Sequence, residues 1–142
     1  MTSVNASVKD NGAIWAIANK MRSDVSAYDR VTESNNTASA KVDVAISAGE
    51  SIMELLNEMK GKALAASQVG LSASAQTAFN ADFIQLRDQV TSIINNSTFD
   101  GSTMVTGALP VNAAVSLGDA QGGNTITVAG ANIGLGGTIT TV

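Results

Sequence analysis

Hydrophobic positions recur with a helical period over the first half of this chain. From Ile14 to Ala66, steps of three and four residues alternate without a break, and only Asp24 and Asn35 at these positions are strongly polar. The series is Ile14, Ile17, Met21, Asp24, Tyr28, Val31, Asn35, Ala38, Val42, Ala45, Gly49, Ile52, Leu56, Met59, Ala63 and Ala66. Such a series lies on one side of a helix. It predicts a helix roughly 80 Å long, which is several times the usual globular length and indicates a rod or bundle.

We expect residues 1–10 to form a disordered or linker start and the long helix to run from about 11 to about 69, where Gly70 ends it. The Ser-, Asn- and Thr-rich stretch 33–41 is its weakest part, and a kink there is an alternative. The unchanged register on both sides favours continuity. Gly49 is either tolerated in the helix or marks the close approach of another helix, and we favour the second interpretation.

A second amphipathic helix is predicted from about 74 to 96, capped by Ser72 or Ser74. Its apolar positions again alternate by fours and threes, at Phe79, Phe83, Leu86, Val90 and Ile93. The short connection predicts that this helix folds back antiparallel on the first, so that 11–97 forms one helical rod.

After residue 97 the composition changes. Nine of the thirteen glycines lie beyond Asp100, which indicates turns rather than helix. Phe99-Asp100-Gly101 predicts a turn, Val115–Leu117 and Thr125–Val128 predict strands around Gly122-Gly123-Asn124, and 138–142 predicts a final Thr-rich strand. The expected fold class is therefore mainly α: a very long helix, an antiparallel second helix, and a small Gly-rich β-hairpin region over 98–142.

Composition narrows the function more than any motif does. The chain has neither cysteine nor histidine, so thiol chemistry and the usual zinc ligands are unavailable. A net charge of −4 gives no basic surface for nucleic acid, and no apolar run is long enough to span a bilayer. The carboxylate pair Glu54 and Glu58 lies on a polar helix face beside lysines, where a solvated surface is the expected role. We therefore expect no catalytic, cofactor or metal site.

Several segments in order resemble one family, the bacterial flagellins. The resemblance covers roughly 7–130 and leans towards the short flagellins of alphaproteobacteria. The segments that carry it are Ser7-Val8-Lys9-Asp10-Asn11-Gly12-Ala13, Ala16-Ile17-Ala18-Asn19-Lys20-Met21-Arg22-Ser23, Asp43 to Leu56, Phe83-Ile84-Gln85-Leu86-Arg87-Asp88-Gln89-Val90, Asn96-Ser97-Thr98-Phe99-Asp100-Gly101, and Val115 to Val128.

The resemblance implies a structural subunit of the flagellar filament, exported to the cell exterior without a cleaved signal peptide. Its implied partners are other flagellin subunits and an export chaperone. Flagellins carry a further helical segment before the position of Ser7 and long C-terminal helices. Since this sequence shows neither, we expect the apolar side of the long helix to lack its C-terminal partner and the chain to be marginal as a monomer.

Two alternatives remain at this stage: a hook–filament junction protein, which shares the N-terminal core, and a soluble coiled-coil binding or adaptor module. A coiled-coil adaptor has no need of the Gly-rich hairpin after Phe99. The residues expected to pack helices or form the interface are Ile14, Ile17, Met21, Val42, Ala45, Gly49, Ile52, Leu56, Met59, Phe79, Phe83, Leu86 and Val90.

Overall fold

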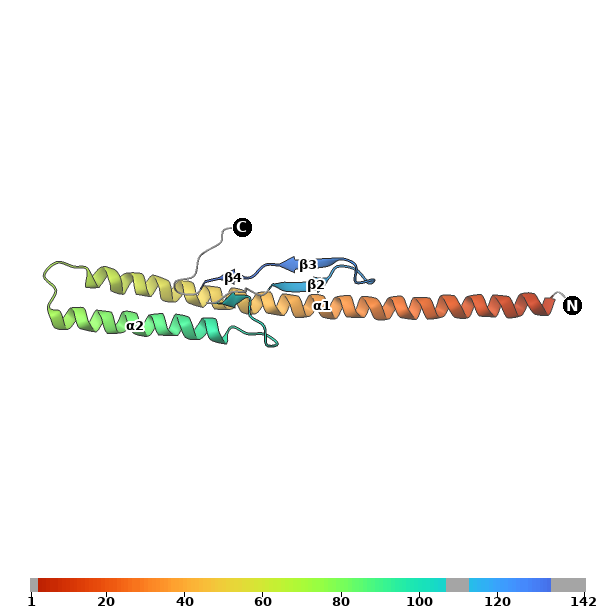
Figure 1. Ribbon diagram of the computed structural model, residues 1–142, viewed down its shortest axis with the longest axis horizontal. Helices are drawn as coiled ribbons and strands as arrows, with labels where there is room; N and C mark the ends of the chain where they lie inside the picture. Colours follow the sequence, from red (N-terminus) through yellow and green to blue (C-terminus); the bar gives the residue numbers. More distant parts are fainter. Residues whose placement is uncertain (1–2, 107–112, 134–142) are drawn as a thin grey trace. The chain divides into compact units, whose positions relative to one another are not determined.

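The computed structural model describes residues 3–106 and 113–133. Its elements in order are α1 (Ser3–Ala66), α2 (Ala73–Asn96), β1 (Val105–Thr106), β2 (Ala114–Leu117), β3 (Thr125–Val128) and β4 (Ala131–Asn132) (Figure 1). The chain divides into two units: unit 1 contains 1–38 and 115–126, and unit 2 contains 39–114 and 127–142. The predicted mainly α fold with a long helix, an antiparallel second helix and a small β-hairpin is confirmed. The strand expected at 138–142 lies outside the described residues.

Unit 2 is built on a helical hairpin. The second half of α1 packs against α2, which runs back along it (Figure 1). The connection places Gly70 at φ +87°, a left-handed conformation that glycine adopts without a Cβ clash. Gly70 lies four residues beyond the last helical residue, Ala66, so it turns the chain rather than capping α1 as expected. Ser72 starts α2, because its Oγ accepts a hydrogen bond from the Ala75 N–H at 3.3 Å.

The hydrophobic core of unit 2 joins both helices to β1. Its buried residues are Ile52, Met59, Leu86, Val90, Ile94 and Val105. Val90 is the most enclosed, with 1% of its surface exposed. Burying such aliphatic side chains contributes about 1.5–3 kcal/mol each. This core therefore holds the hairpin together and draws the first strand of the β region onto it.

The residues of α1 that face α2 match only every second member of the predicted apolar series. Ala48 and Leu55 lie on the core side, whereas Leu56, which the series placed there, is 45% exposed. Ile52 and Met59 belong to both patterns because the two series share every second member. The series that contains Leu55 and the series that contains Leu56 both keep a three-four alternation. Only packing against α2 selects between them.

The turn after α2 forms at the predicted residues. Phe99 and Ser102 exchange backbone hydrogen bonds of 2.8 and 3.0 Å, and Asp100 and Gly101 between them have φ of 50° and 69°. Two successive positive φ values make a tight hairpin turn of the type that Asp-Gly favours. The chain then enters β1, which pairs in parallel with β4 through Val105 and Ala131. This parallel pair was not predicted.

Unit 1 contains the first half of α1 and most of the β2–β3 hairpin. The expectation of a disordered or linker start over 1–10 is wrong for 3–10, because α1 begins at Ser3. No proline or glycine interrupts 3–11, and extending an existing helix costs far less than nucleating one. α1 is also continuous through 33–41, where Ser34 Oγ accepts a hydrogen bond from the Leu117 N–H at 3.0 Å.

The connection between β2 and β3 is organised by a carboxylate rather than by glycines alone. Asp119 Oδ1 accepts from the Gly123 N–H at 2.9 Å, and Oδ2 accepts from the Asn124 N–H and Nδ2 at 3.0 and 2.6 Å. Desolvation raises the pKa of Asp119, but these hydrogen bonds together outweigh it and hold the pKa below its ordinary value. Gly118 is closely packed, since a Cβ there would lie 3.3 Å from the Asn124 carbonyl oxygen and the neighbour would have to shift slightly.

Candidate assembly surface

An exposed row of apolar side chains runs along α1 in unit 1. We call it the N-terminal row, and its members are Ile14, Ile17, Met21, Val25 and Tyr28. Spacings of three, four, four and three residues place them on one side of the helix. Trp15 is exposed beside the row. Single exposed apolar residues are ordinary, but an aligned run of five on one helix makes this row a candidate contact surface.

A second exposed row lies on α1 in unit 2. Ile46, Met53 and Leu64 are separated by seven and eleven residues, which are close to two and three helical turns, so they point in one direction. We call these three residues the outer row. Leu56 is exposed between the outer row and the core side of the helix. The second half of α1 thus has one apolar side covered by α2 and another that is open.

The other predicted interface residues fall into the core or into grooves. Ile52, Met59, Leu86 and Val90 are buried, and Ala45 and Phe83 pack against them. Val42 and Gly49 line an apolar groove of about 280 Å³ between α1 and the β1–β4 region. Phe79 lines a groove of about 600 Å³ near the α1–α2 connection, whose lining is partly polar. A Cβ at Gly49 would meet nothing within 4 Å, so no helix among the described residues approaches it closely.

A polar pair lies across the hairpin seam. Lys62 falls on the core series of α1, seven residues after Leu55, and its Nζ lies 2.7 Å from Asp82 Oδ2 on α2. The hydrogen bond from Lys62 to Asp82, with the charge of that carboxylate, raises the pKa of Lys62 above its ordinary value. Both side chains keep part of their surface in water, so the pair adds only modest stability.

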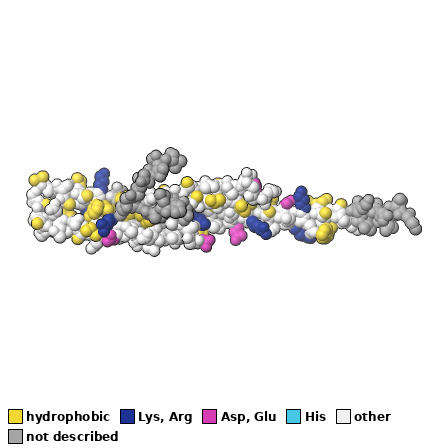
Figure 2. Space-filling view, in the orientation of Figure 1, with side chains coloured by type: hydrophobic (Ala, Val, Ile, Leu, Met, Phe, Trp, Pro, Cys, Tyr) yellow, Lys and Arg dark blue, Asp and Glu magenta, His cyan; other side chains and the backbone are white. Residues whose placement is uncertain are grey.

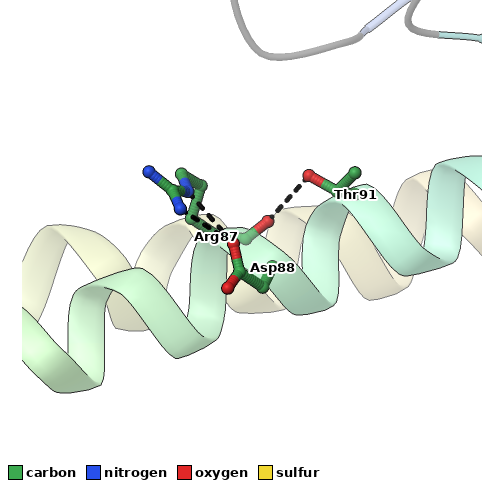
Figure 3. A network of polar contacts seen from close by, with 3 residues as sticks. All are labelled: Arg87, Asp88 and Thr91. Atoms are coloured by element: carbon green, nitrogen blue, oxygen red, sulfur yellow. Dashed lines mark hydrogen bonds and ion pairs between the residues drawn. The ribbon is translucent and has the colours of Figure 1, made fainter.

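The outward side of α2 has a different character from the two exposed rows. Arg87 donates to the Asp88 carboxylate at 2.9 Å, and Thr91 Oγ1 donates to the Arg87 carbonyl at 3.1 Å (Figure 3). Both contacts, and a second hydrogen bond of 3.2 Å from Arg87 Nε to the Asp88 carboxylate, are local and solvent-exposed. On the face drawn in Figure 2, charged side chains are few and separated by hydrophobic and uncharged ones. The exposed apolar rows of α1 are therefore the candidate contact surface of the described residues.

The described residues contain no group of three or more acidic, histidine or cysteine side chains placed to hold a metal ion. Neither α1 nor α2 contains an apolar window of the length and hydropathy that crossing a membrane requires. This surface therefore has the features of a docking site for another apolar helix. The helix α1 is long, its apolar rows are exposed, and few charges interrupt them.

Comparison with known proteins identifies the family to which this helical chain belongs. The chain matches the family described as the bacterial flagellin N-terminal helical region over residues 4–109. It belongs to that family.

Its similar relatives are flagellins of alphaproteobacterial type. The chain is 39% identical over 131 residues to Flagellin FljO of Caulobacter vibrioides, covering 92% of this chain and 47% of that protein. It is 36% identical over 140 residues to Flagellin FljK of the same organism, covering 96% and 51%. To Flagellin A of Rhizobium meliloti it is 39% identical over 95 residues, covering 67% and 23%. The chain spans about half the length of the Caulobacter relatives.

Sequence reasoning missed three features of this surface. It assigned Leu56 to packing or an interface but did not assign Leu55 to packing, it expected Lys62 on a polar helix face, and it did not single out Asp119. A signal for Lys62 was present, since it lies seven residues from Leu55 and fourteen from Ala48. For Asp119, an aspartate four and five residues before Gly123 and Asn124 is compatible with an acceptor for turn N–H groups.

Proposed function

We propose that this chain forms the N-terminal helical part of a bacterial flagellar filament subunit. Its function is structural: α1 and α2 supply helices that pack laterally in a filament outside the cell and serve motility. The observation that carries the proposal is the exposed N-terminal row, because five aligned apolar side chains need a covering partner. Membership in the flagellin family supports flagellin subunits as that partner.

The covering helices are best sought in flagellin itself. The relatives are about twice as long as the matched region, so they contain residues able to supply further helices. We propose that core helices from the C-terminal part of a flagellin, together with neighbouring subunits, cover the N-terminal and outer rows. An export chaperone that shields these rows before assembly, and export without signal cleavage, belong to the same proposal.

The two alternatives gain no support. The relatives compared above carry the name flagellin, and none is named a junction protein. A coiled-coil adaptor does not account for the parallel β1–β4 pair or the carboxylate-organised hairpin, which lie beyond the helical rod.

Charge reversal of the surface tests the proposal. Ile17→Glu places a carboxylate on the N-terminal row, whereas Ser23→Glu places the same group on the opposite side of α1. Both positions are exposed, so neither substitution disturbs the folded chain. The full protein that carries this sequence is expressed in a flagellin-deficient strain, and filaments are counted by electron microscopy. We expect Ile17→Glu to abolish filaments and Ser23→Glu to retain them. Normal filaments from Ile17→Glu would overturn the proposal.

The isolated 142-residue chain offers a second measurement. Open apolar rows predict concentration-dependent association at micromolar concentration, detected by sedimentation velocity, and Ile17→Glu reduces it. A monodisperse, cooperatively folding monomer at the same concentration would count against the surface.

A further inference from the structure

The four methionines within the described residues divide sharply by exposure. Met21 on the N-terminal row is 62% exposed and Met53 on the outer row is 65% exposed, whereas Met59 and Met104 are 6% and 7% exposed. Both exposed methionines lie on the surface to which assembly is assigned above, and both buried ones lie inside unit 2. Before that surface is covered, the two exposed thioethers are open to dissolved reagents.

We propose that Met21 and Met53 are sites of reversible oxidation that controls whether the subunit can assemble. The inference rests on the proposed function, because it assigns the two rows to contact with other flagellin helices. The reagent class is a hydroperoxide, of which hydrogen peroxide is the simplest.

The chemistry balances without help from any other group. A lone pair on the methionine sulfur attacks one peroxide oxygen, the S–O bond forms, and the O–O bond breaks. The proton on the transferred oxygen passes to the departing hydroxide, which leaves as water. The sulfur is oxidised to the sulfoxide and the peroxide is reduced. The product is a polar, chiral side chain. A methionine sulfoxide reductase converts it back to the thioether with a dithiol as the reductant, which is oxidised to a disulfide while the oxygen leaves as water.

The consequence follows from where the new oxygen lies. A sulfoxide on either row brings a strong hydrogen-bond acceptor into a contact that consists of apolar side chains, where it has no partner. Because both residues are exposed before assembly, oxidation leaves the fold of the free chain intact and weakens only the contact. Once assembled, the rows are covered and the sulfur atoms are protected. Oxidation therefore acts on unassembled subunits.

The first experiment measures site selectivity. The folded chain is treated with hydrogen peroxide, quenched at intervals and digested, and each methionine peptide is quantified by mass spectrometry. We expect Met21 and Met53 to be oxidised about tenfold faster than Met59 and Met104. Circular dichroism of the treated protein should retain its helical signal. Equal rates at all four sites would overturn the proposal.

The second experiment measures assembly with matched double variants. Met21→Leu with Met53→Leu removes the reactive sulfur atoms while keeping similar volume, and Met59→Leu with Met104→Leu does the same in the core. The full protein is oxidised before polymerisation onto filament seeds. We expect oxidised wild type and the Met59/Met104 variant to lose about tenfold in assembly rate, and the Met21/Met53 variant to lose little. Treatment with methionine sulfoxide reductase should restore the wild type.

Equal peroxide sensitivity of the Met21/Met53 variant and the wild type would overturn the inference. This failure is distinguishable from failure of the proposed function. If the N-terminal row has no part in assembly, unoxidised Ile17→Glu polymerises normally. If only the oxidation proposal is wrong, Ile17→Glu still blocks assembly while oxidised wild type polymerises.

Discussion

Lys62 Nζ and Asp82 Oδ2 lie 2.7 Å apart across the seam between α1 and α2. Lys62 occupies the same side of α1 as Leu55 and Ala48, so a charged residue stands where the core series calls for an apolar one. Both side chains remain partly exposed, so the pair accompanies the packing of Leu55 against α2 and does not decide it alone.

Asp82→Asn tests this relationship. Because Asp82 raises the pKa of Lys62, the charged lysine is favoured in the folded state. Its stabilising contribution is fully present below the ordinary lysine pKa of 10.5 and is lost as the pH rises through the higher folded-state value. We expect Asp82→Asn to lower the thermal midpoint at pH 7, and the difference from wild type to shrink above about pH 10.5. Thermal unfolding followed by circular dichroism at several pH values measures both.

Asp88→Asn serves as the control for that series. Asp88 pairs with its neighbour Arg87 on the exposed side of α2, where an ion pair contributes little. Its thermal midpoint should match wild type at every pH. A pH-dependent loss as large as that of Asp82→Asn would show that the seam pair has no special role.

The helices and the Asp100-Gly101 turn could be predicted from the sequence because each depends on local signals. A sustained three-four period, an Oγ acceptor at Ser72 and a turn dipeptide tolerant of positive φ act within a few residues. The β1–β4 pair could not be predicted in this way. It joins Val105 to Ala131 over two residues per strand, and nothing local in either segment specifies the other.

The candidate surface was predictable only in part. Ile14, Ile17 and Met21 were assigned to packing or an interface from period alone, and the structure leaves them exposed. Their contact with another molecule remains a proposal. Period cannot distinguish a side covered by the same chain from one covered by a partner. Leu55 and Leu56 illustrate the limit, since both fit a three-four series and only the position of α2 decides which is buried.

The two adjacent leucines provide a direct test of the packed seam. Leu55→Ala removes a side chain that packs against the core and should cost about 2 kcal/mol of unfolding free energy. Leu56→Ala acts at an exposed position and should change it by less than about 0.5 kcal/mol. Urea unfolding of the two variants measures the difference. A larger loss for Leu56→Ala would support the series predicted from sequence instead.

The hydrogen bonds that Asp119 accepts are expected to stabilise the β2–β3 hairpin and to be lost in acid. The hydrogen bonds from Gly123 and Asn124 lower its pKa despite the opposing desolvation, so the folded hairpin favours the carboxylate. That contribution is present above the ordinary pKa and is lost as the pH falls through the lower folded-state value. Amide hydrogen exchange should show protection at Gly123 and Asn124 at pH 5 that disappears well below pH 3.8.

Asp119→Asn should weaken the same protection at pH 5, because a neutral amide is a poorer acceptor than a carboxylate. Asp100→Asn is the matched control, since Asn also tolerates the positive φ at that turn and Asp100 takes no part in the β2–β3 connection. If these amides exchange at the wild-type rate in both variants, the Asp119 carboxylate is not what orders the hairpin.

Substitution of Gly49 by alanine should affect the stability of the chain and its assembly differently. A methyl group there meets nothing within 4 Å, and alanine is preferred to glycine in a helix interior, so Gly49→Ala should stabilise the isolated chain by about 1 kcal/mol. Gly61→Ala, also in an open helical position, should give the same gain.

The two variants should differ in how fast they polymerise into filaments. Gly49 lines the apolar groove beside Ile46, whereas Gly61 is exposed away from it. If a helix of another subunit approaches Gly49 closely, Gly49→Ala slows polymerisation onto seeds while Gly61→Ala does not. Equal polymerisation of both variants would assign Gly49 to a tolerated weakness of α1 and restrict the assembly surface to the N-terminal and outer rows.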